Sequence, residues 1–369
     1  MKYHFYLGIL LLALACEKTD PAPIPFPVDP IPVDSAYGYP PRVLFNCLGL
    51  DTVKYDYPPI PGWTKTLIPS NLNTPAYGAI YFVDEMNGFL LQYNGIINKT
   101  TDGGQTWIKV LNQPNTVFLK MSFSSDEHGV VAFTNSDQST RAYFLTTYDS
   151  GNTWTQDPNM GTNFDFVNQM QFLSPDLGFI SATLQSTFSS NLYKTIDSAK
   201  TWTPVLDQNL PYFNGFFRFQ SRDTGYFAAN GALVRTTDGG QQWASTEIPF
   251  YGATDVRSFD DSFAVVYGSD GVAVTRSGGN RWEKISQRPT SLGRFFADGS
   301  AVLFQQIKAC NTVSDGNTYA FVTTNDFGAT WHVGPLTKTF WFVDNYAFVN
   351  ERCIFHLGSD GKLYKWTRL

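Results

Sequence analysis

The chain has 369 residues, of which 43% are hydrophobic and 16% aromatic, but only 16% are charged. This apolar content is ample for a packed core and excludes general disorder, and a formal net charge of −6 lacks the basic footprint of a nucleic-acid-binding protein. Aromatic side chains suit a pleated, half-buried surface, so the composition favours many β-strands over helices.

Residues 1–15 are predicted to be a signal peptide. Lys2 supplies a positive charge, and the apolar run 5–14 is too short to span a bilayer as a helix. The run leads into Leu12-Ala13-Leu14-Ala15-Cys16, which resembles the lipobox of bacterial lipoproteins, although Ala13 stands where that family commonly has Leu. The resemblance implies cleavage before Cys16 and lipidation of that cysteine. The alternative is an ordinary cleaved signal in which Cys16 is present by chance.

A proline-rich segment follows the cysteine. Charged residues at 17–20 resemble the surface-export signal of Bacteroidetes lipoproteins, and Pro occupies nearly every second position from 20 to 34. Such a segment cannot form a helix or a central strand, and as polyproline it rises about 3.1 Å per residue. We therefore predict a lipidated tether over 16–42, with a reach of roughly 80 Å, and a folded domain over 43–369. We expect the protein to be lipid-anchored in the cell envelope at the outer membrane, with exposure at the cell surface left open.

An octet of the form Thr-x-Asp-x-Gly-x-x-Trp occurs four times, and two further copies each depart from it at one position. The copies cover 100–107, 147–154, 195–202, 236–243, 275–282 and 324–331. Their third and last residues are Asp102 and Trp107, Asp149 and Trp154, Asp197 and Trp202, Asp238 and Trp243, Ser277 and Trp282, and Asp326 and Trp331. A period of 40 to 50 residues with four short strands in each unit is typical of β-propeller blades.

The octets resemble the Asp-box, also called the bacterial neuraminidase repeat. An Asp side chain can accept hydrogen bonds from turn amides, a Gly two positions later allows a positive φ, and a Trp buries a large apolar face. The resemblance therefore assigns these Asp and Trp residues a structural role, as turn and core. Ala199 replaces the Gly of one copy and Ser277 the Asp of another, and we expect these two turns to be looser.

A second motif, in which Phe precedes Gly by six residues, comes before the octets. It starts at Phe82, Phe123, Phe172 and Phe219, and related copies start at Phe259, Phe296 and Phe342. Seven such hairpins stand against six octets, because the chain ends before the fourth strand of its last unit. The segment 63–68 looks like a fourth strand without the preceding three, so we predict that it completes the last blade. The fold class is therefore predicted as all-β, a single seven-bladed β-propeller whose closure hides the strand edges.

Signal, tether and seven blades together resemble the photosystem II stability and assembly factor family, which also has relatives in non-photosynthetic bacteria. The resemblance covers about 63–369 and rests on repeat motifs, so it argues for architecture more strongly than for function. It implies a scaffold that binds or assembles other proteins. Nothing in the sequence suggests photosynthesis.

No enzymatic site, metal or cofactor is predicted. Sialidases, which carry Asp-boxes, need an arginine cluster for the substrate carboxylate, a Tyr nucleophile with a Glu partner and an Asp acid, and their Arg-Ile-Pro motif is missing here. His128, His332 and His356 fall in different blades without metal-ligand spacing. Cys310 and Cys353 occupy comparable places in adjacent blades and could form a disulfide, for which Cys47 could compete; buried free thiols are the alternative.

The candidate binding face is the one where the links between blades gather around the channel, since loops on a rigid scaffold carry sites. It is rich in aromatic residues and has arginines near the starts of inner strands, and both are common interface anchors. Its residues are Phe164, Phe166, Tyr212, Phe213, Phe216, Arg218, Phe250, Tyr251, Arg257 and Arg294. Packing of these aromatic residues between blades is the alternative.

Two functions are consistent with these patterns. The first is a non-enzymatic, membrane-tethered scaffold that binds protein partners of the cell envelope and no nucleic acid. The second is a surface glycan-binding protein or a sialidase-like glycoside hydrolase. Convergent carboxylates and arginines on the channel face would favour the second function, whereas an aromatic face without an acid pair would favour the first.

Overall fold

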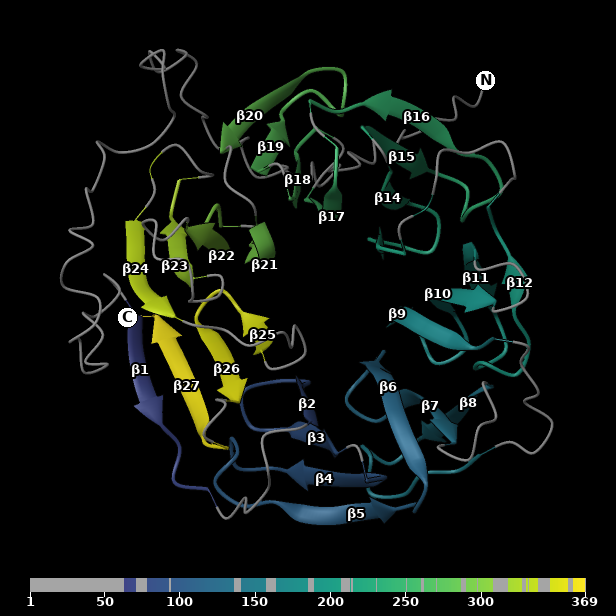
Figure 1. Ribbon diagram of the computed structural model, residues 1–369. Coiled ribbons are helices and arrows are strands. Elements are labelled where there is room, and N and C mark those ends of the chain that lie inside the picture. Colours follow the sequence, from purple (N-terminus) through teal and green to yellow (C-terminus); the bar gives the residue numbers. More distant parts are fainter. Residues whose placement is uncertain are drawn as a thin grey trace, which may run out of the picture. The chain divides into compact units, whose positions relative to one another are not determined.

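The computed structural model describes residues 63–70, 78–92, 94–135, 141–156, 164–184, 189–206, 213, 215–229, 231–249, 251–259, 262–269, 271–286, 290–296, 298–307, 318–326, 330, 332–337, 346–357 and 361–368. The chain divides into two units, Met1–Gly38 and Tyr39–Leu369, and every described residue belongs to the second. The described elements are all strands, arranged as seven sheets around a ring (Figure 1). The predicted seven-bladed β-propeller is confirmed. In the described part of the chain, no helix is long and apolar enough to cross a membrane.

The first three blades contain strands that follow one another along the chain, with the first strand of each blade innermost (Figure 1). Blade 1 consists of β2 (Gly78–Phe82), β3 (Gly88–Gln92), β4 (Ile96–Thr100) and β5 (Ile108–Asn112). Blade 2 consists of β6 (Thr116–Phe123), β7 (Gly129–Asn135) and β8 (Ala142–Thr147). Blade 3 consists of β9 (Phe166–Phe172), β10 (Gly178–Leu184), β11 (Ser189–Thr195) and β12 (Thr203–Pro204).

The next three blades follow the same order from the channel outwards. Blade 4 consists of β13 (Phe217–Phe219), β14 (Gly225–Ala229), β15 (Ala232–Thr236) and β16 (Ala244–Glu247). Blade 5 consists of β17 (Ala253–Ser258), β18 (Ala264–Gly268), β19 (Gly271–Thr275) and β20 (Trp282–Ser286). Blade 6 consists of β21 (Thr290–Phe295), β22 (Ala301–Ile307), β23 (Thr318–Thr324) and β24 (His332–Thr337).

The seventh blade is closed by the two ends of the domain. It contains β25 (Tyr346–Asn350), β26 (Cys353–Leu357), β27 (Leu363–Arg368) and, as its outer strand, β1 (Trp63–Leu67). β1 and β27 pair antiparallel from Trp63↔Arg368 to Leu67↔Tyr364, which is visible as a purple strand beside a yellow one in Figure 1. This confirms that an N-terminal strand completes the last blade.

Each junction between two neighbouring blades has its own hydrophobic cluster. Phe89 of blade 1 packs with Val131 of blade 2, for example, and Phe179 of blade 3 stacks on Phe219 of blade 4 with ring centroids 3.5 Å apart. Middle strands are therefore buried on both faces, which explains continuous apolar runs such as Gly225–Ala229 in β14. The core of the domain is this set of seven interfaces rather than one central mass.

The Phe-and-Gly motif is a cross-strand pair. In β13 and β14, Phe219 lies directly opposite Gly225, and a Cβ atom added to Gly225 would come within 2.5 Å of the Phe219 ring. The pairs that begin at Phe82, Phe123 and Phe172 have the same geometry. Only glycine leaves room for the ring to lie flat across the neighbouring strand.

The octets form turns between the third and fourth strands. In the first copy, Asp102 Oδ1 accepts a hydrogen bond from the Thr106 amide at 2.9 Å, and Asp102 Oδ2 accepts one from the Thr106 hydroxyl at 2.6 Å. The Thr100 hydroxyl accepts from the Gly104 amide at 2.9 Å. In four other copies, the backbone amide four residues later donates the same hydrogen bond to the Asp carboxylate, at Asp149, Asp197, Asp238 and Asp326. In the second copy, hydrogen bonds from Thr153 lower the pKa of Asp149 to about 2.

The two departing octets behave differently from each other. At Ala199 the hydrogen bonds have ordinary lengths, with the Thr201 amide 2.9 Å from Asp197 Oδ1, so the expected looser turn is wrong there. The departure appears in the backbone instead, because Ala199 takes a φ of 67°, which favours glycine. Ser277 replaces a carboxylate with one hydroxyl, whose oxygen accepts from the Arg281 amide at 2.9 Å. Trp331 lies outside the described residues.

Candidate binding site at the channel

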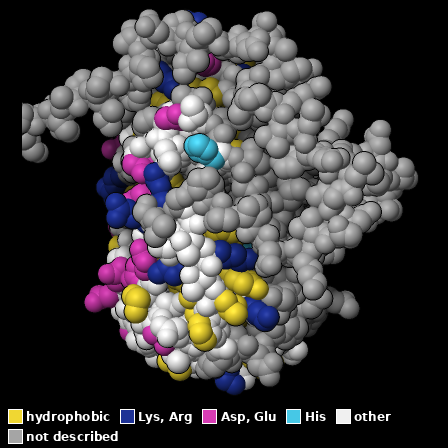
Figure 2. All heavy atoms as spheres, turned by 90° about the vertical axis from the view of Figure 1, so that its left-hand side faces the viewer, with side chains coloured by type: hydrophobic (Ala, Val, Ile, Leu, Met, Phe, Trp, Pro, Cys, Tyr) yellow, Lys and Arg dark blue, Asp and Glu magenta, His cyan; other side chains and the backbone are white. Residues whose placement is uncertain are grey.

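The candidate site lies on the face opposite the octet turns. The octet turns of blades 1 to 5 each bond to the hairpin between the first two strands of their own blade, as when the Gly103 amide donates to the Met86 carbonyl. The first strand therefore starts on the other face, where the links between blades arrive. Figure 2 shows the outer side of the molecule that carries β24 and β1. On its described part, acidic, basic and apolar side chains are interspersed.

Three exposed aromatic side chains stand where the inner strands of blades 3, 4 and 5 begin. Phe166 is the first residue of β9 and is 60% exposed, Phe216 directly precedes β13 and is 42% exposed, and Tyr251 precedes β17 and is 70% exposed. We call these three residues the aromatic rim. Large aromatic side chains exposed on successive blades are typical of a contact surface.

The other aromatic candidates do not belong to this rim. Phe164 is buried because its carbonyl accepts from the Ala142 amide of blade 2, which holds its ring against Tyr193. Phe213 is buried edge-on against Phe227 in the cluster between blades 3 and 4. For these two residues, packing between blades is the correct interpretation. Tyr212 and Phe250 lie outside the described residues.

The three candidate arginines come together along neighbouring inner strands. Arg218 on β13, Arg257 on β17 and Arg294 on β21 are each half-buried, and each lies one residue before the end of its strand. The prediction that they lie near the strand starts is therefore wrong: they lie towards the octet-turn end of the inner strands, because the hairpin that follows each first strand is on that side. Asp255 is the carboxylate beside them, with one oxygen 3.5 Å from Arg257 Nε. The Tyr267 hydroxyl on β18 lies 2.7 Å from that same oxygen, Asp255 Oδ2, and 2.6 Å from the Gly293 carbonyl. We call Arg218, Arg257 and Arg294 the arginine trio.

Positive charges in the trio repel one another. Repulsion by Arg257, followed by burial, lowers the pKa of Arg218 to about 9, and Asp255 only partly opposes this. Burial, followed by repulsion from Arg257, lowers the pKa of Arg294 to about 10. Burial raises the pKa of Tyr267 well above its ordinary value, so this phenol is neutral. The cluster thus combines three guanidinium groups with one carboxylate, an arrangement that attracts anions.

The junction between blades 3 and 4, next to the trio, is built from neutral groups. Gln171 donates from Nε2 to the Phe219 carbonyl at 2.7 Å and accepts from the Phe219 amide at 2.9 Å. Gln169 does the same for Phe217, at 2.7 and 3.0 Å. Two side-chain amides therefore act as an extra strand along β13. Sequence analysis missed both residues, although their alternation in Gln-x-Gln matches the period of a strand.

Similar contacts tie other blades together. Tyr81 of blade 1 accepts from the Phe123 amide of blade 2 at 3.1 Å, and Arg294 of blade 6 donates to the Phe348 carbonyl of blade 7 at 2.7 Å. Lys365 of blade 7 donates to Glu85 of blade 1 at 2.8 Å. Arg294 is therefore partly committed to the scaffold, whereas no hydrogen bond joins Arg218 to any residue that the structure describes.

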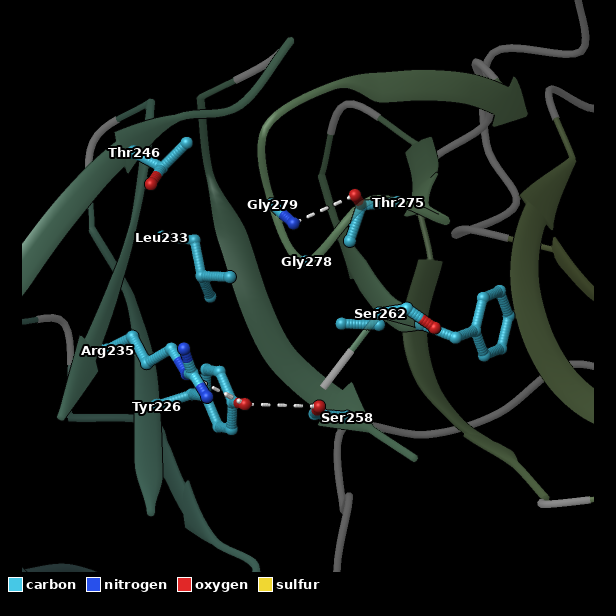
Figure 3. A pocket seen from close by; sticks show the side chains of 11 residues that line it. Tyr226, Leu233, Arg235, Thr246, Ser258, Ser262, Thr275, Gly278 and Gly279 are labelled. Carbon is cyan, nitrogen blue, oxygen red and sulfur yellow. Dashed lines mark hydrogen bonds between the residues drawn. The ribbon is translucent and has the colours of Figure 1, made fainter. Parts of the chain in front are cut away.

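Two hollows elsewhere in the described part of the chain are less suited to binding a partner. A cavity of about 20 Å³ lies between blades 4 and 5, where Figure 3 shows the Tyr226 hydroxyl between Arg235 and Ser258. That volume suits about one water molecule. An open groove on the outer edge of blades 3 and 4 is crossed by a hydrogen bond from Lys194 Nζ to the Gly239 carbonyl.

Metal-binding and cysteine chemistry are limited in the described region. Its His, Cys, Asp and Glu residues form no group of three that could hold a metal ion. Cys353 is a buried free thiol, and burial raises its pKa to about 12, which makes it a poor nucleophile. The alternative of a buried free thiol therefore holds for Cys353, and Cys16, Cys47 and Cys310 lie outside the described residues.

Comparisons with known proteins support the fold alone. No family model and no curated protein matches the chain. A structure of YCF48 bound to D1 peptide is similar with a TM-score of 0.56 at 16% identity, covering 84% of this chain and 96% of that one. YCF48 from Cyanidioschyzon merolae gives 0.56 at 16% identity, covering 83% and 99%. A streptogramin B lyase gives 0.54 at 12% identity, covering 83% and 98%.

Proposed function

We propose that this chain is a non-enzymatic β-propeller scaffold that binds a protein partner through its channel face. The observation that carries the proposal is the aromatic rim, which exposes three large rings at or just before the starts of inner strands on consecutive blades. Aromatic and arginine side chains are the usual anchors of protein interfaces. The structurally similar YCF48, which was solved with a peptide bound, lends support to a peptide or protein ligand on a propeller of this kind.

The same proposal includes the cellular location and the repeat family of the protein. It takes the octets to be Asp-boxes in a propeller of the photosystem II assembly factor type, and Cys16 to carry lipid chains that hold the protein at the outer membrane. Each buried CH₂ of such a chain adds about 0.8 kcal/mol of membrane affinity. The tether would let the channel face meet a partner in an envelope complex.

Glycoside hydrolysis receives less support from the described site. The arginine trio is the kind of cluster that binds an acidic sugar, and a tyrosine and a carboxylate lie beside it. Tyr267 is only 2% exposed, however, and its hydroxyl is shared between Asp255 and the Gly293 carbonyl. A nucleophile needs access to its substrate and an activated hydroxyl, and burial here works against both.

The test is capture of a partner by the full lipidated chain, extracted from its own membrane in mild detergent. Phe216→Ser combined with Tyr251→Ser removes two rings of the rim. Tyr148→Ser is the matched control, because Tyr148 is 59% exposed on the octet face. We expect a stoichiometric protein partner with wild type and control, and at least a tenfold loss with the double variant.

Two results would overturn the proposal. One is a chain that comes out of the membrane alone, without a stoichiometric partner. The other is hydrolysis of a fluorogenic acidic glycoside that disappears with Arg218→Gln, which would replace the scaffold by an enzyme.

A further inference from the structure

The arginine trio has more hydrogen-bonding capacity than the described protein uses. A guanidinium carries five N–H donors. Arg294 gives one to the Phe348 carbonyl at 2.7 Å, whereas Arg257 Nε is buried and makes no hydrogen bond, despite its 3.5 Å ion-pair distance to Asp255. Arg218 has no hydrogen-bond partner among the residues that the structure describes.

The charge of the cluster is also uncompensated. Asp255 is the carboxylate that acts on Arg218 and Arg294, and the neighbouring phenols of Tyr81 and Tyr267 are neutral. Among the residues that the structure describes, three positive charges against one negative charge leave an excess of two. Holding such charges together away from bulk water costs free energy unless an anion joins them.

The cluster is within reach of solvent. The side chain of Arg257 is 17% exposed and that of Asp255 is 20% exposed. The strands β13, β17 and β21 that carry the trio border the middle of the ring (Figure 1). A small ion can therefore reach the guanidinium groups without opening a blade.

We propose that the arginine trio binds a doubly charged oxyanion, which is held by bidentate hydrogen bonds between the inner strands of blades 4, 5 and 6. Phosphate, sulfate and a pair of carboxylates each have the charge and the paired acceptor oxygens that planar guanidinium groups match. The anion is either a free ion or a group carried by the protein partner. Anion binding goes beyond the proposed function and stands whether or not a partner is captured.

The experiment is calorimetric titration of the full chain with inorganic phosphate, at an ionic strength held constant with sodium chloride. We expect one saturable site per chain in wild type. Arg218→Gln should weaken phosphate binding at least tenfold, because it removes a charge and a bidentate donor pair. Arg276→Gln is the matched control, since Arg276 lies on the octet turn of blade 5, where it pairs with Glu283 at 3.4 Å.

Arg218→Lys keeps the charge but loses the planar donor fork, and it replaces Arg218→Gln if that variant does not fold. It should also bind phosphate more weakly than wild type. Absence of a saturable site, or equal binding by wild type and a folded Arg218 variant, would overturn the inference. Equal weakening by Arg276→Gln would overturn it too, because binding would then reflect overall charge.

A second experiment distinguishes a free anion from one carried by the protein partner. Saturating phosphate is added to the partner-capture experiment described above. Release of the partner would support the trio with a partner-borne anion, and retention together with saturable phosphate binding would support it with a free ion. Failure of partner capture alone leaves the titration unaffected, so the two proposals fail separately.

Discussion

Polar side chains on the inner strands are hydrogen-bonded in opposite ways in two places. One is the junction between blades 3 and 4, and the other is the arginine trio across blades 4 to 6. Both place polar side chains on inner strands beside the channel. Gln169 and Gln171 satisfy the backbone of β13 with neutral amides, each of which donates one hydrogen bond and accepts one. The trio holds three cations around Asp255 and leaves donors unused. A buried polar group that is hydrogen-bonded within the protein stabilises the fold, whereas one with unused donors points to a bound ligand.

The largest effect is expected at the glutamine junction. Gln171→Leu leaves both the amide and the carbonyl of Phe219 without a partner in a buried strand. Each unsatisfied group costs roughly 1–3 kcal/mol, so we expect a loss of about 2–4 kcal/mol in the free energy of unfolding, measured in urea. Gln105→Leu, at an exposed octet turn, is the control and should change it by less than about 0.5 kcal/mol. A similar cost in both variants would contradict the comparison.

The next effect concerns the close packing that frames β13. Gly225→Ala places a Cβ within 2.5 Å of the Phe219 ring. Overpacking of this kind costs about 1–3 kcal/mol, which should appear as a lower urea midpoint. Combining Gly225→Ala with Phe219→Leu tests the cause, because the smaller side chain should tolerate the methyl group. A fully additive double-mutant cycle would show that ring and glycine do not interact.

Fold and site differ in how far the sequence predicts them. Blade number and closure follow from octets and Phe-and-Gly pairs, whose partners lie within a few residues of one another. Gln171 and Tyr267 instead bond to the next blade, and for Gln171 the partner lies 48 residues away. The Gln-x-Gln alternation fits a strand, but it does not identify the partner on the next blade. Phe164 and Phe213 were predicted on the binding face but are buried between blades. Whether an aromatic residue in a connection between blades is buried depends on contacts with the neighbouring blade, which the local sequence does not show.

The arginine trio should respond in the opposite direction from the glutamines. Arg218→Gln removes a cation that Arg257 repels, so the free energy of unfolding should equal or exceed that of wild type, within about 1 kcal/mol. Urea unfolding in a phosphate-free buffer measures this. A loss as large as that of Gln171→Leu would assign Arg218 to the scaffold and remove the contrast.

Acid should weaken the octet turn at Asp149. The hydrogen bonds from Thr153 lower the pKa of Asp149 to about 2 from 3.8, so the unfolded chain takes up this proton first. The contribution of Asp149 is therefore present above pH 3.8 and is lost as the pH falls towards 2. The difference in unfolding free energy between wild type and Asp149→Asn should narrow over that window. A constant difference would show that charge is irrelevant to the turn.

The smallest effect is expected at Ala199, where the sequence departs from its own repeat. Its φ of 67° costs an L-residue about 1–2 kcal/mol, and a glycine there would relieve that strain while adding freedom to the unfolded chain. We expect Ala199→Gly to raise the free energy of unfolding by about 0.5 kcal/mol. The reverse change at an equivalent position, Gly151→Ala with a φ of 75°, should be clearly destabilising, since the added Cβ would also come within 2.5 Å of the Phe89 ring. Destabilisation by Ala199→Gly would mean that the methyl group contributes more to packing than its backbone costs, because Ala199 is fully buried in the cluster between blades 2 and 3.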